Sequence, residues 1–223
     1  MLPRLHVVTD DAVLAADGFD DRSRAVMASG GDRIALHVRG HATPTARLYA
    51  WARALRAASQ GYGTWLFVND RVDVALACDA DGLQLGRGSL PLPDARTLFG
   101  ANGVIGYSAH AGDEAACAVA AGADYVLLGS IWATTSHPDA RPGGVELVSS
   151  AAQTVGAPVI AIGGVTPARI AAVAGAGGYG AAVLDGVWHA ADAGIAVAGY
   201  LDAIAAAYAD GGGEEYIRWQ RKR

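Results

Sequence analysis

Eight short apolar stretches alternate with eight helical stretches along this chain, and the pattern predicts an α/β protein that forms a single (β/α)8 TIM barrel. The apolar stretches contain few polar residues, which is typical of parallel strands that are covered on both faces. Successive strands are separated by enough residues for one helix and two turns. An open doubly wound sheet is the competing fold, but no Gly-x-Gly-x-x-Gly motif follows the first strand.

The first four units are recognised from the apolar stretches and from the residues that start and stop helices. Strands are predicted over residues 5–9, 34–39, 64–68 and 82–85, and helices over residues 11–30, 44–59, 72–78 and 91–99. Asp11 is expected to cap the first helix and Thr43 the second, because their side-chain oxygens accept hydrogen bonds from unpaired backbone N–H groups. Pro44 and Pro91 suit the first turn of a helix, where no N–H partner is needed.

The last four units repeat the pattern and end in a short tail. Strands are predicted over residues 104–108, 125–128, 158–162 and 180–184, and helices over residues 113–121, 145–155, 167–174 and 186–209. We expect the barrel to occupy residues 1–210. Residues 211–223 begin with glycines and end with basic residues, which predicts a flexible or loosely docked tail.

The bulk composition narrows the class of protein and its partners. Of the 223 residues, 52% are hydrophobic and 17% are charged, as in a folded globular chain. The net charge of −5 argues against a nucleic-acid partner, and Cys78 and Cys117 have no metal-ligand spacing. No apolar stretch has the length of a signal-peptide core or a membrane span. We therefore expect a cytoplasmic protein with a small-molecule ligand and no nucleic-acid or membrane partner.

Polar residues follow most of the predicted strands, and the C-terminal strand ends form the active-site face of such barrels. They include Arg39, His41, Asn69, Asp70, Arg87, Ser89, Ser108, His110 and the segment 130–137. His37 shares strand parity with Arg39, so both are expected to point into the barrel. The opening would then hold up to four histidines, and imidazole exchanges protons near neutral pH, which favours acid–base chemistry. Any one of these histidines could also be only a hydrogen-bonded structural residue.

Glycines follow the last two predicted strands, where barrels of this kind commonly hold a phosphate on backbone N–H groups. Gly163-Gly164 follows the seventh strand and Gly186 the eighth. Glycine at any one of these positions could serve only to allow a tight turn into a helix. Their occurrence after both strands favours an anion site.

Ordered motifs run along nearly the whole chain. They are Val8-Thr9-Asp10, Phe67-Val68-Asn69-Asp70-Arg71-Val72-Asp73, Ala80-Asp81-Gly82-Leu83-Gln84-Leu85-Gly86, Ala123-Asp124-Tyr125-Val126 and Ala161-Ile162-Gly163-Gly164-Val165. Together they resemble the thiamine phosphate synthase/TenI superfamily. The resemblance implies a (β/α)8 barrel, often a homodimer, that handles thiazole phosphates in thiamine biosynthesis. Its synthases use magnesium to join a pyrimidine pyrophosphate to a thiazole phosphate, whereas its TenI branch aromatises a carboxythiazole phosphate by moving a proton, without a metal.

Departures from the synthase pattern favour the TenI branch. Synthases carry Gln-x-Arg-Glu-Lys after the second strand, and His41 replaces that lysine here. The resemblance implies a magnesium site made by Asp70 and a second aspartate, which is Ser89 in this chain. The synthase motif Pro-Thr-x-Thr-Lys after the sixth strand ends in His137 here, so a second lysine is lost.

These three replacements remove charged groups that would hold magnesium pyrophosphate. A charge-assisted hydrogen bond contributes about 1.5–3 kcal/mol, and a single carboxylate is a poor magnesium site. We therefore expect an isomerase that aromatises a carboxythiazole phosphate and needs no metal or other cofactor. A magnesium-dependent synthase, and a non-catalytic barrel that binds a thiamine-related ligand, remain the alternatives.

The resemblance also assigns roles to individual residues. TenI proteins carry a catalytic histidine where this chain has Ser130, so His137, His41 or His110 would replace it, with His137 the first choice. The expected substrate contacts are His37, Arg39, Asn69, Asp70, Ser108, Ser130, Thr134 and Ser136, and the expected phosphate contacts are Gly163, Gly164, Asp185 and Gly186. Asp185 replaces a family serine, and its carboxylate would repel a bound phosphate or cap the helix that follows.

Overall fold

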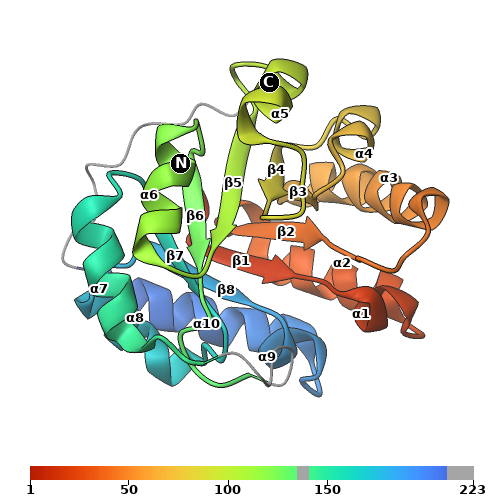
Figure 1. The fold of residues 1–223 in the computed structure, drawn as a ribbon. Helices are drawn as coiled ribbons and strands as arrows, with labels where there is room; N and C mark the ends of the chain where they lie inside the picture. Colours follow the sequence, from red (N-terminus) through yellow and green to blue (C-terminus); the bar gives the residue numbers. More distant parts are fainter. Residues whose placement is uncertain (135–140, 210–223) are drawn as a thin grey trace.

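Eight parallel strands close into one barrel in sequence order in the computed structural model, which describes residues 1–134 and 141–209 (Figure 1). The strands are β1 (Leu5–Val8), β2 (Ile34–Val38), β3 (Trp65–Asn69), β4 (Gly82–Leu85), β5 (Val104–Ala109), β6 (Tyr125–Leu128), β7 (Val159–Ile162) and β8 (Gly180–Val183). β1 pairs with β2 on one side and with β8 on the other, which closes the barrel. The predicted (β/α)8 barrel is confirmed.

Helices surround the strands, as the βαβ pattern predicts. They are α1 (Asp11–Ala15), α2 (Phe19–Gly30), α3 (Thr45–Tyr62), α4 (Val72–Ala77), α5 (Leu92–Phe99), α6 (Gly112–Ala120), α7 (Gly144–Thr154), α8 (Ile170–Gly175), α9 (Asp185–Trp188) and α10 (Ala193–Ala207), with 3-10 turns η1 (Gly31–Arg33) and η2 (Pro167–Arg169). α10 packs against α2 and α8. The predicted tail lies outside the described residues, so its boundary with the barrel stays a prediction.

The first predicted helix is two helices, and two predicted caps are wrong. Gly18, at φ 75°, separates α1 from α2. The cap of α1 is Asp10, whose carboxylate accepts from a backbone N–H of the first turn. Asp11 instead accepts a 2.6 Å hydrogen bond from the Thr43 hydroxyl, so it joins the start of α1 to the loop before α3. Thr43 does not cap α3, because Pro44 occupies the N-cap position of that helix. Either aspartate could cap a helix by its own chemistry. Asp10 does so because Asp11 is bonded to the loop before α3.

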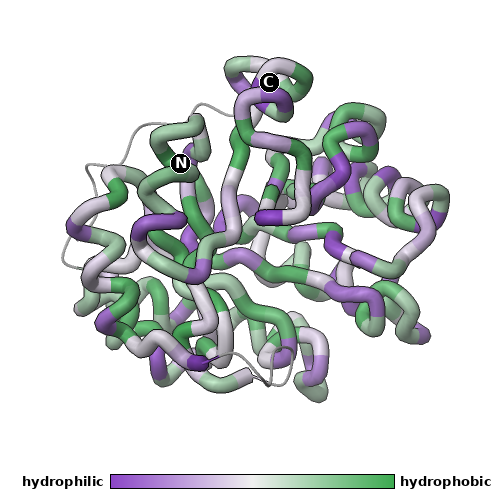
Figure 2. The backbone as a smooth tube through the Cα atoms, viewed as in Figure 1, coloured by the Kyte–Doolittle hydropathy of each residue, from purple (hydrophilic) through white to green (hydrophobic). Residues whose placement is uncertain are grey.

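Strand side chains alternate between two hydrophobic clusters, because successive residues of a strand point to opposite faces. One cluster fills the barrel interior and includes Phe67 and Tyr125. The larger cluster packs the outer strand faces against the helices and includes Leu36 and Val68. Figure 2 shows hydrophobic residues concentrated along the strands. Both strand faces are therefore buried, which explains the nearly continuous apolar stretches in the sequence.

Two interior glycines make room for the aromatic rings inside the barrel. A Cβ atom on Gly82 would lie 2.1 Å from the Phe67 ring, and one on Gly106 would lie 2.2 Å from the Tyr125 ring. Neither distance is compatible with a van der Waals contact, so any side chain at these positions would displace a ring. The two rings close the barrel interior below the strand ends.

Two motif aspartates act in the scaffold. Asp81, before β4, accepts hydrogen bonds from Arg56 of α3 at 2.9 Å and from the Leu66 backbone N–H of β3 at 2.8 Å. Asp124, before β6, accepts from Arg96 of α5 in the same way. Each carboxylate thus joins a helix to the N-terminal end of the barrel, away from the strand ends that carry the site.

Candidate functional site

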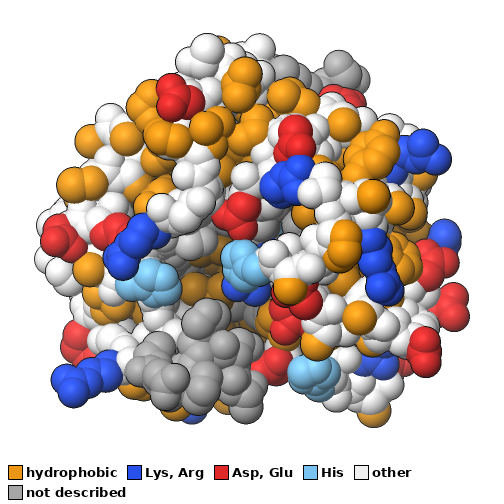
Figure 3. Space-filling view, turned by 45° about the vertical axis from the view of Figure 1, so that its right-hand side comes forward, with side chains coloured by type: hydrophobic (Ala, Val, Ile, Leu, Met, Phe, Trp, Pro, Cys, Tyr) orange, Lys and Arg blue, Asp and Glu red, His pale blue; other side chains and the backbone are white. Residues whose placement is uncertain are grey.

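A cavity of about 500 Å³ opens at the C-terminal ends of the strands. This volume lies within the usual range of about 300–1,000 Å³ for small-molecule sites. In the space-filling view, histidine, basic and acidic side chains gather around a hollow on one face of the molecule (Figure 3). The lining combines apolar side chains such as Leu85, Leu127 and Ile162 with the charged groups around the opening.

Most of the predicted site residues that the structure describes line this cavity. They are Arg39, His41, Asn69, Asp70, Ser108, His110, Ser130, Thr134, Gly163 and Asp185. His37 does not reach the cavity, because it is fully buried inside the barrel below Asn69. Gly164 and Gly186 are outside the lining as well. Ser136 and His137 lie outside the described residues. None of the predicted catalytic or binding roles is tested by these positions, and they stay predictions.

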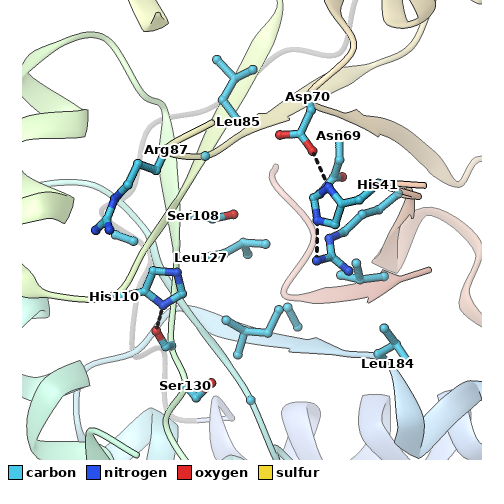
Figure 4. A pocket seen from close by; sticks show the side chains of 18 of the residues that line it. His41, Asn69, Asp70, Leu85, Arg87, Ser108, His110, Leu127, Ser130 and Leu184 are labelled. Carbon is cyan, nitrogen blue, oxygen red and sulfur yellow. Dashed lines mark hydrogen bonds and ion pairs between the residues drawn. The ribbon is translucent and has the colours of Figure 1, made fainter. Parts of the chain in front are cut away.

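One wall of the cavity holds Arg39, His41 and Asp70, which form a chain of polar contacts that ends at Ser89 behind the lining. Arg39 Nη2 donates to His41 Nε2 at 2.7 Å, so a neutral His41 ring carries its proton on Nδ1. That Nδ1 lies 3.7 Å from Asp70 Oδ2 (Figure 4). The Ser89 hydroxyl donates to the other oxygen of Asp70. The Asp70 carboxylate therefore faces two donors, the Ser89 hydroxyl and the exposed His41 ring.

The backbone at the end of β3 places Asp70 in this chain. Asp70 adopts φ 64°, in the left-handed region that aspartate tolerates better than most residues. Its N–H donates to the Gln84 carbonyl at 2.8 Å, which holds the turn against β4. The carboxylate faces the His41 ring, and the preceding Asn69 lines the same cavity (Figure 4).

The opposite wall is made by Arg87 and His110 (Figure 4). His110 Nδ1 donates to the Gly129 carbonyl at 2.6 Å, which leaves Nε2 of the neutral ring as an acceptor. Glu114 accepts from the His110 backbone N–H at 2.7 Å and pairs with Arg87 at 3.3 Å. The sequence places Arg87 among the polar residues that follow the fourth strand, but no catalytic or binding role was predicted for it.

The loop after β6 brings Ser130 and Thr134 to the cavity. Its two ends are joined by hydrogen bonds from Gly143 N–H to the Ser130 carbonyl and from Gly144 N–H to the Ile131 carbonyl, at 2.9 and 3.0 Å. Backbone pairing at the base therefore fixes where the loop leaves the barrel. Ser130 lines the cavity beside the end of β7.

The glycines after β7 and β8 have clear packing roles. Gly163 and Gly164 adopt φ 97° and 63°, which glycine alone adopts without strain. A Cβ on Gly164 would lie 2.6 Å from the Ala133 carbonyl oxygen, and one on Gly186 would lie 2.2 Å from the Tyr200 hydroxyl. Asp185 begins α9, and its carboxylate lies 3.4 Å from His189 Nδ1. A phosphate at these positions remains a prediction.

Within residues 1–134 and 141–209, no three His, Cys, Asp or Glu side chains come together as a metal-binding group would. Over the same residues, every helix is too short or too polar to cross a membrane.

A closed parallel barrel with a polar cavity at the C-terminal strand ends defines a (β/α)8 barrel built to bind a small ligand. The family model described as thiamine monophosphate synthase matches residues 5–187, and the chain belongs to this family.

Individual relatives match nearly the whole chain. The chain is 39% identical to the thiamine-phosphate synthase of Methanoculleus marisnigri over 93% of its length and 98% of the relative. It is 40% identical to that of Methanoregula boonei over 91% of its length and 89% of the relative. Among solved structures, thiamine phosphate pyrophosphorylase from Pyrococcus furiosus superposes with a TM-score of 0.79 at 33% identity, covering 92% of this chain and 96% of that one.

These relatives overturn the expectation of an isomerase. Proteins about 40% identical over nearly their full length are named thiamine-phosphate synthase, so the branch assignment was wrong. The three replacements in the synthase motifs do not leave the opening without basic groups, because other residues supply them. In the folded chain Arg87 also reaches the cavity, and Arg39 and His41 form a hydrogen-bonded pair there. The basic groups around the opening therefore extend beyond the motif positions.

Proposed function

We propose that this protein is a thiamine-phosphate synthase, a transferase that joins a pyrimidine pyrophosphate to a thiazole phosphate and releases pyrophosphate. The observation that carries the proposal is the identity of 39% and 40% to proteins of that name over more than nine-tenths of the chain. The cavity volume of about 500 Å³ suits two small heterocycles with their phosphates.

The basic groups on the two walls suit a ligand with several phosphate charges. Negative charge develops on the pyrophosphate as its bond to the pyrimidine breaks, and fixed donors aimed at that charge lower the barrier. Guanidinium groups bind phosphate oxygens through paired N–H donors. Arg39 and Arg87 line opposite walls, and we assign both to the pyrophosphate.

The two histidines of the opening have different hydrogen-bonding capacities. Neutral His41 has its Nδ1–H directed at Asp70, whereas neutral His110 leaves Nε2 as an acceptor. Both nitrogens of neutral His41 therefore face partners already, Asp70 and Arg39, whereas His110 suits a ligand group that donates a hydrogen bond or a proton. Ser130, Thr134 and Gly163, which line the same cavity, would support the thiazole phosphate.

Asp70 would be a poor magnesium site by itself, but its carboxylate fits an ion that arrives already bound to the pyrophosphate. Magnesium commonly binds through one or two carboxylates together with substrate phosphates and water. Asp70 is the carboxylate that would hold it, since it lines the cavity between the His41 and Ser89 side chains. When bound, the ion would neutralise charge on the pyrophosphate. Arg39 and Arg87 would orient the same group from the protein side.

The assembly and location of the protein follow from family resemblance. A homodimer and a cytoplasmic location are both proposals that rest on the match to this biosynthetic family. Size-exclusion chromatography with light scattering would test the dimer, and a mass equal to one chain would contradict it.

The direct test is the synthase reaction itself. Purified protein is mixed with the pyrimidine pyrophosphate, the thiazole phosphate and magnesium, and thiamine phosphate and pyrophosphate are quantified separately. The two products should appear in equal amounts, and omission of either substrate or of magnesium should abolish both. Absence of thiamine phosphate from a folded sample, checked by circular dichroism, would contradict the proposal.

A further inference from the structure

A chain of buried polar groups runs through the barrel interior to the cavity floor. His6 Nε2 lies 3.1 Å from the Pro3 carbonyl oxygen, and His6 Nδ1 lies 2.8 Å from His37 Nε2. His37 Nδ1 lies 3.1 Å from the Oδ1 position of Asn69, which lines the cavity. Both rings are completely buried. The chain therefore has one end at the bottom of the barrel and the other at the ligand site.

Burial keeps both rings neutral at physiological pH. It is the largest influence on His6, whose pKa lies well below the ordinary value, and the neighbouring His37 lowers it further. Burial also lowers the pKa of His37 to about 4, with Asn69 opposing the shift and Arg39 adding to it. The Phe67 ring stacks on His37 at 4.9 Å, and the Tyr125 ring lies 5.2 Å from His6. Each ring therefore carries one proton.

The positions of these two protons follow from the three contacts. A carbonyl oxygen only accepts, so the proton of His6 lies on Nε2, which faces Pro3. His6 Nδ1 is then an acceptor, and the proton of His37 lies on Nε2 to complete their contact. His37 Nδ1 is left as an acceptor that faces Asn69. Only a donor on Asn69 completes the third contact.

We propose that His6 and His37 are a positioning pair that holds the Asn69 amide with its NH2 group toward His37 and its carbonyl oxygen toward the cavity. The two ends of an amide have nearly the same shape, so the hydrogen-bond partners decide the orientation. An oxygen facing His37 Nδ1 would place two lone pairs against each other. The cavity floor therefore presents an acceptor at Asn69, which selects a ligand with an N–H or O–H donor at that point.

A neighbouring network in the same barrel provides a matched control. The Tyr125 hydroxyl donates to Gln84 Oε1 at 2.6 Å, and Gln84 Nε2 donates to the Ser108 hydroxyl at 2.9 Å. The Tyr125 hydroxyl fixes this second amide without any titratable imidazole. Tyr125→Phe should therefore disturb Gln84 and Ser108 while leaving the Asn69 amide in place.

The proton pattern can be measured on the free protein. Long-range 1H–15N NMR correlations distinguish protonated from unprotonated ring nitrogens, and loss of signals in His6→Gln and His37→Gln assigns each ring. At pH 7 both rings should carry a proton on Nε2 alone. A doubly protonated His37 ring, or a proton on its Nδ1, would overturn the proposal. No catalysis is involved, so this result is independent of whether the protein is a synthase.

Substitution of Asn69 gives a second spectroscopic test. Asn69→Asp removes the NH2 donor, so His37 should become doubly protonated at pH 7 to satisfy the carboxylate. Asn69→Ala, which offers no hydrogen-bonding group at all, should leave both rings in their original neutral form. Unchanged His37 signals in folded Asn69→Asp protein would contradict the assignment.

The kinetic consequence rests on the proposed synthase function. His37→Leu releases the Asn69 amide and should raise KM for one substrate about tenfold with kcat changed less than threefold. His37→Gln should restore KM to within about threefold, because a glutamine amide offers a donor to His6 and an acceptor to Asn69. Tyr125→Phe, which disturbs a different amide, should leave both histidine rings protonated on Nε2 alone in the NMR measurement. Equal KM values for wild-type protein and His37→Leu would overturn the positioning role.

Discussion

His37 and His41 lie close together in the sequence, but they occupy opposite environments. The His37 ring is fully buried below the cavity, whereas the His41 side chain is 63% exposed at the opening. His37 is stacked on Phe67 and bonded to His6 and Asn69, and His41 contacts only polar partners, Arg39 and Asp70, in the bonds described here. The same side chain is part of the scaffold at one position and available to ligand at the other.

The difference shows how burial changes the use of a polar group. Inside the barrel, leaving a hydrogen bond unmade is costly, so each polar group is held in one protonation state and one orientation. At the opening, water can replace any partner that a ligand displaces. Changes in the buried layer should therefore alter stability first, and changes at the opening should alter catalysis first.

The largest effect is expected at the opening. Arg39→Ala should lower kcat/KM of the synthase reaction about 100- to 1,000-fold, as the loss of one preorganised donor does elsewhere. The free energy of unfolding should change by less than about 0.5 kcal/mol, because the side chain is not part of the core. Arg39→Lys is the matched control, and it should recover only part of the activity since the paired donors are lost. Activity of Arg39→Ala within threefold of wild type would contradict the assignment to the pyrophosphate.

The next effect is a loss of stability at low pH, caused by the buried His37. The pKa of His37 is lowered by burial to about 4, so the unfolded chain binds a proton below about pH 6.5 while the folded chain does not. The free energy of unfolding should therefore fall as the pH drops from 6.5 to 4, by about 3 kcal/mol for His37. Urea unfolding at several pH values measures this decline. It should be smaller in His37→Gln, and an equal decline in both proteins would contradict the prediction.

A smaller effect is expected for the second buried network. Tyr125→Phe removes the donor to Gln84 Oε1 and should lower the free energy of unfolding by about 1–2 kcal/mol. Its kcat/KM should fall much less than that of Arg39→Ala, because Tyr125 reaches the cavity only through Gln84 and Ser108. Urea unfolding and steady-state kinetics on the same sample test both parts. A large loss of kcat/KM with an unchanged free energy of unfolding would contradict the expectation that changes inside the barrel affect stability before catalysis.

The smallest effect is expected at Asp185. Asp185→Ser removes a carboxylate from the cavity lining and should tighten binding of a thiazole phosphate about fivefold, equivalent to about 1 kcal/mol of repulsion. Asp192→Ser is the control, since it makes the same change of charge outside the cavity and keeps a residue able to cap α10. Isothermal titration calorimetry measures both affinities. Equal or weaker binding in Asp185→Ser would count against repulsion at this site.

The strands and their order could be predicted from the sequence because their signals are local. An apolar stretch covered on both faces and a helix between successive strands leave few topologies. All eight predicted strands match the observed ones to within one residue at either end, and most of the cavity lining could be identified as the residues that follow them. The alternation of side chains along a strand also correctly predicted that His37 and Arg39 point to the inner side of the barrel.

Only the tertiary structure decided how deeply each side chain is buried and which residues it contacts. Parity predicts that His37 points inward, but its burial follows from the ring of Phe67 on β3 and from Asn69 above it. Asp11 bonds to a distant loop and not to the first turn of its own helix, and Arg87 pairs with Glu114 of α6 at the cavity wall. Hydrogen bonds and ligand contacts form between residues that are far apart in the chain. The sequence by itself therefore determined which residues surround the barrel opening, and the packing of neighbouring strands determined which of them a ligand can reach.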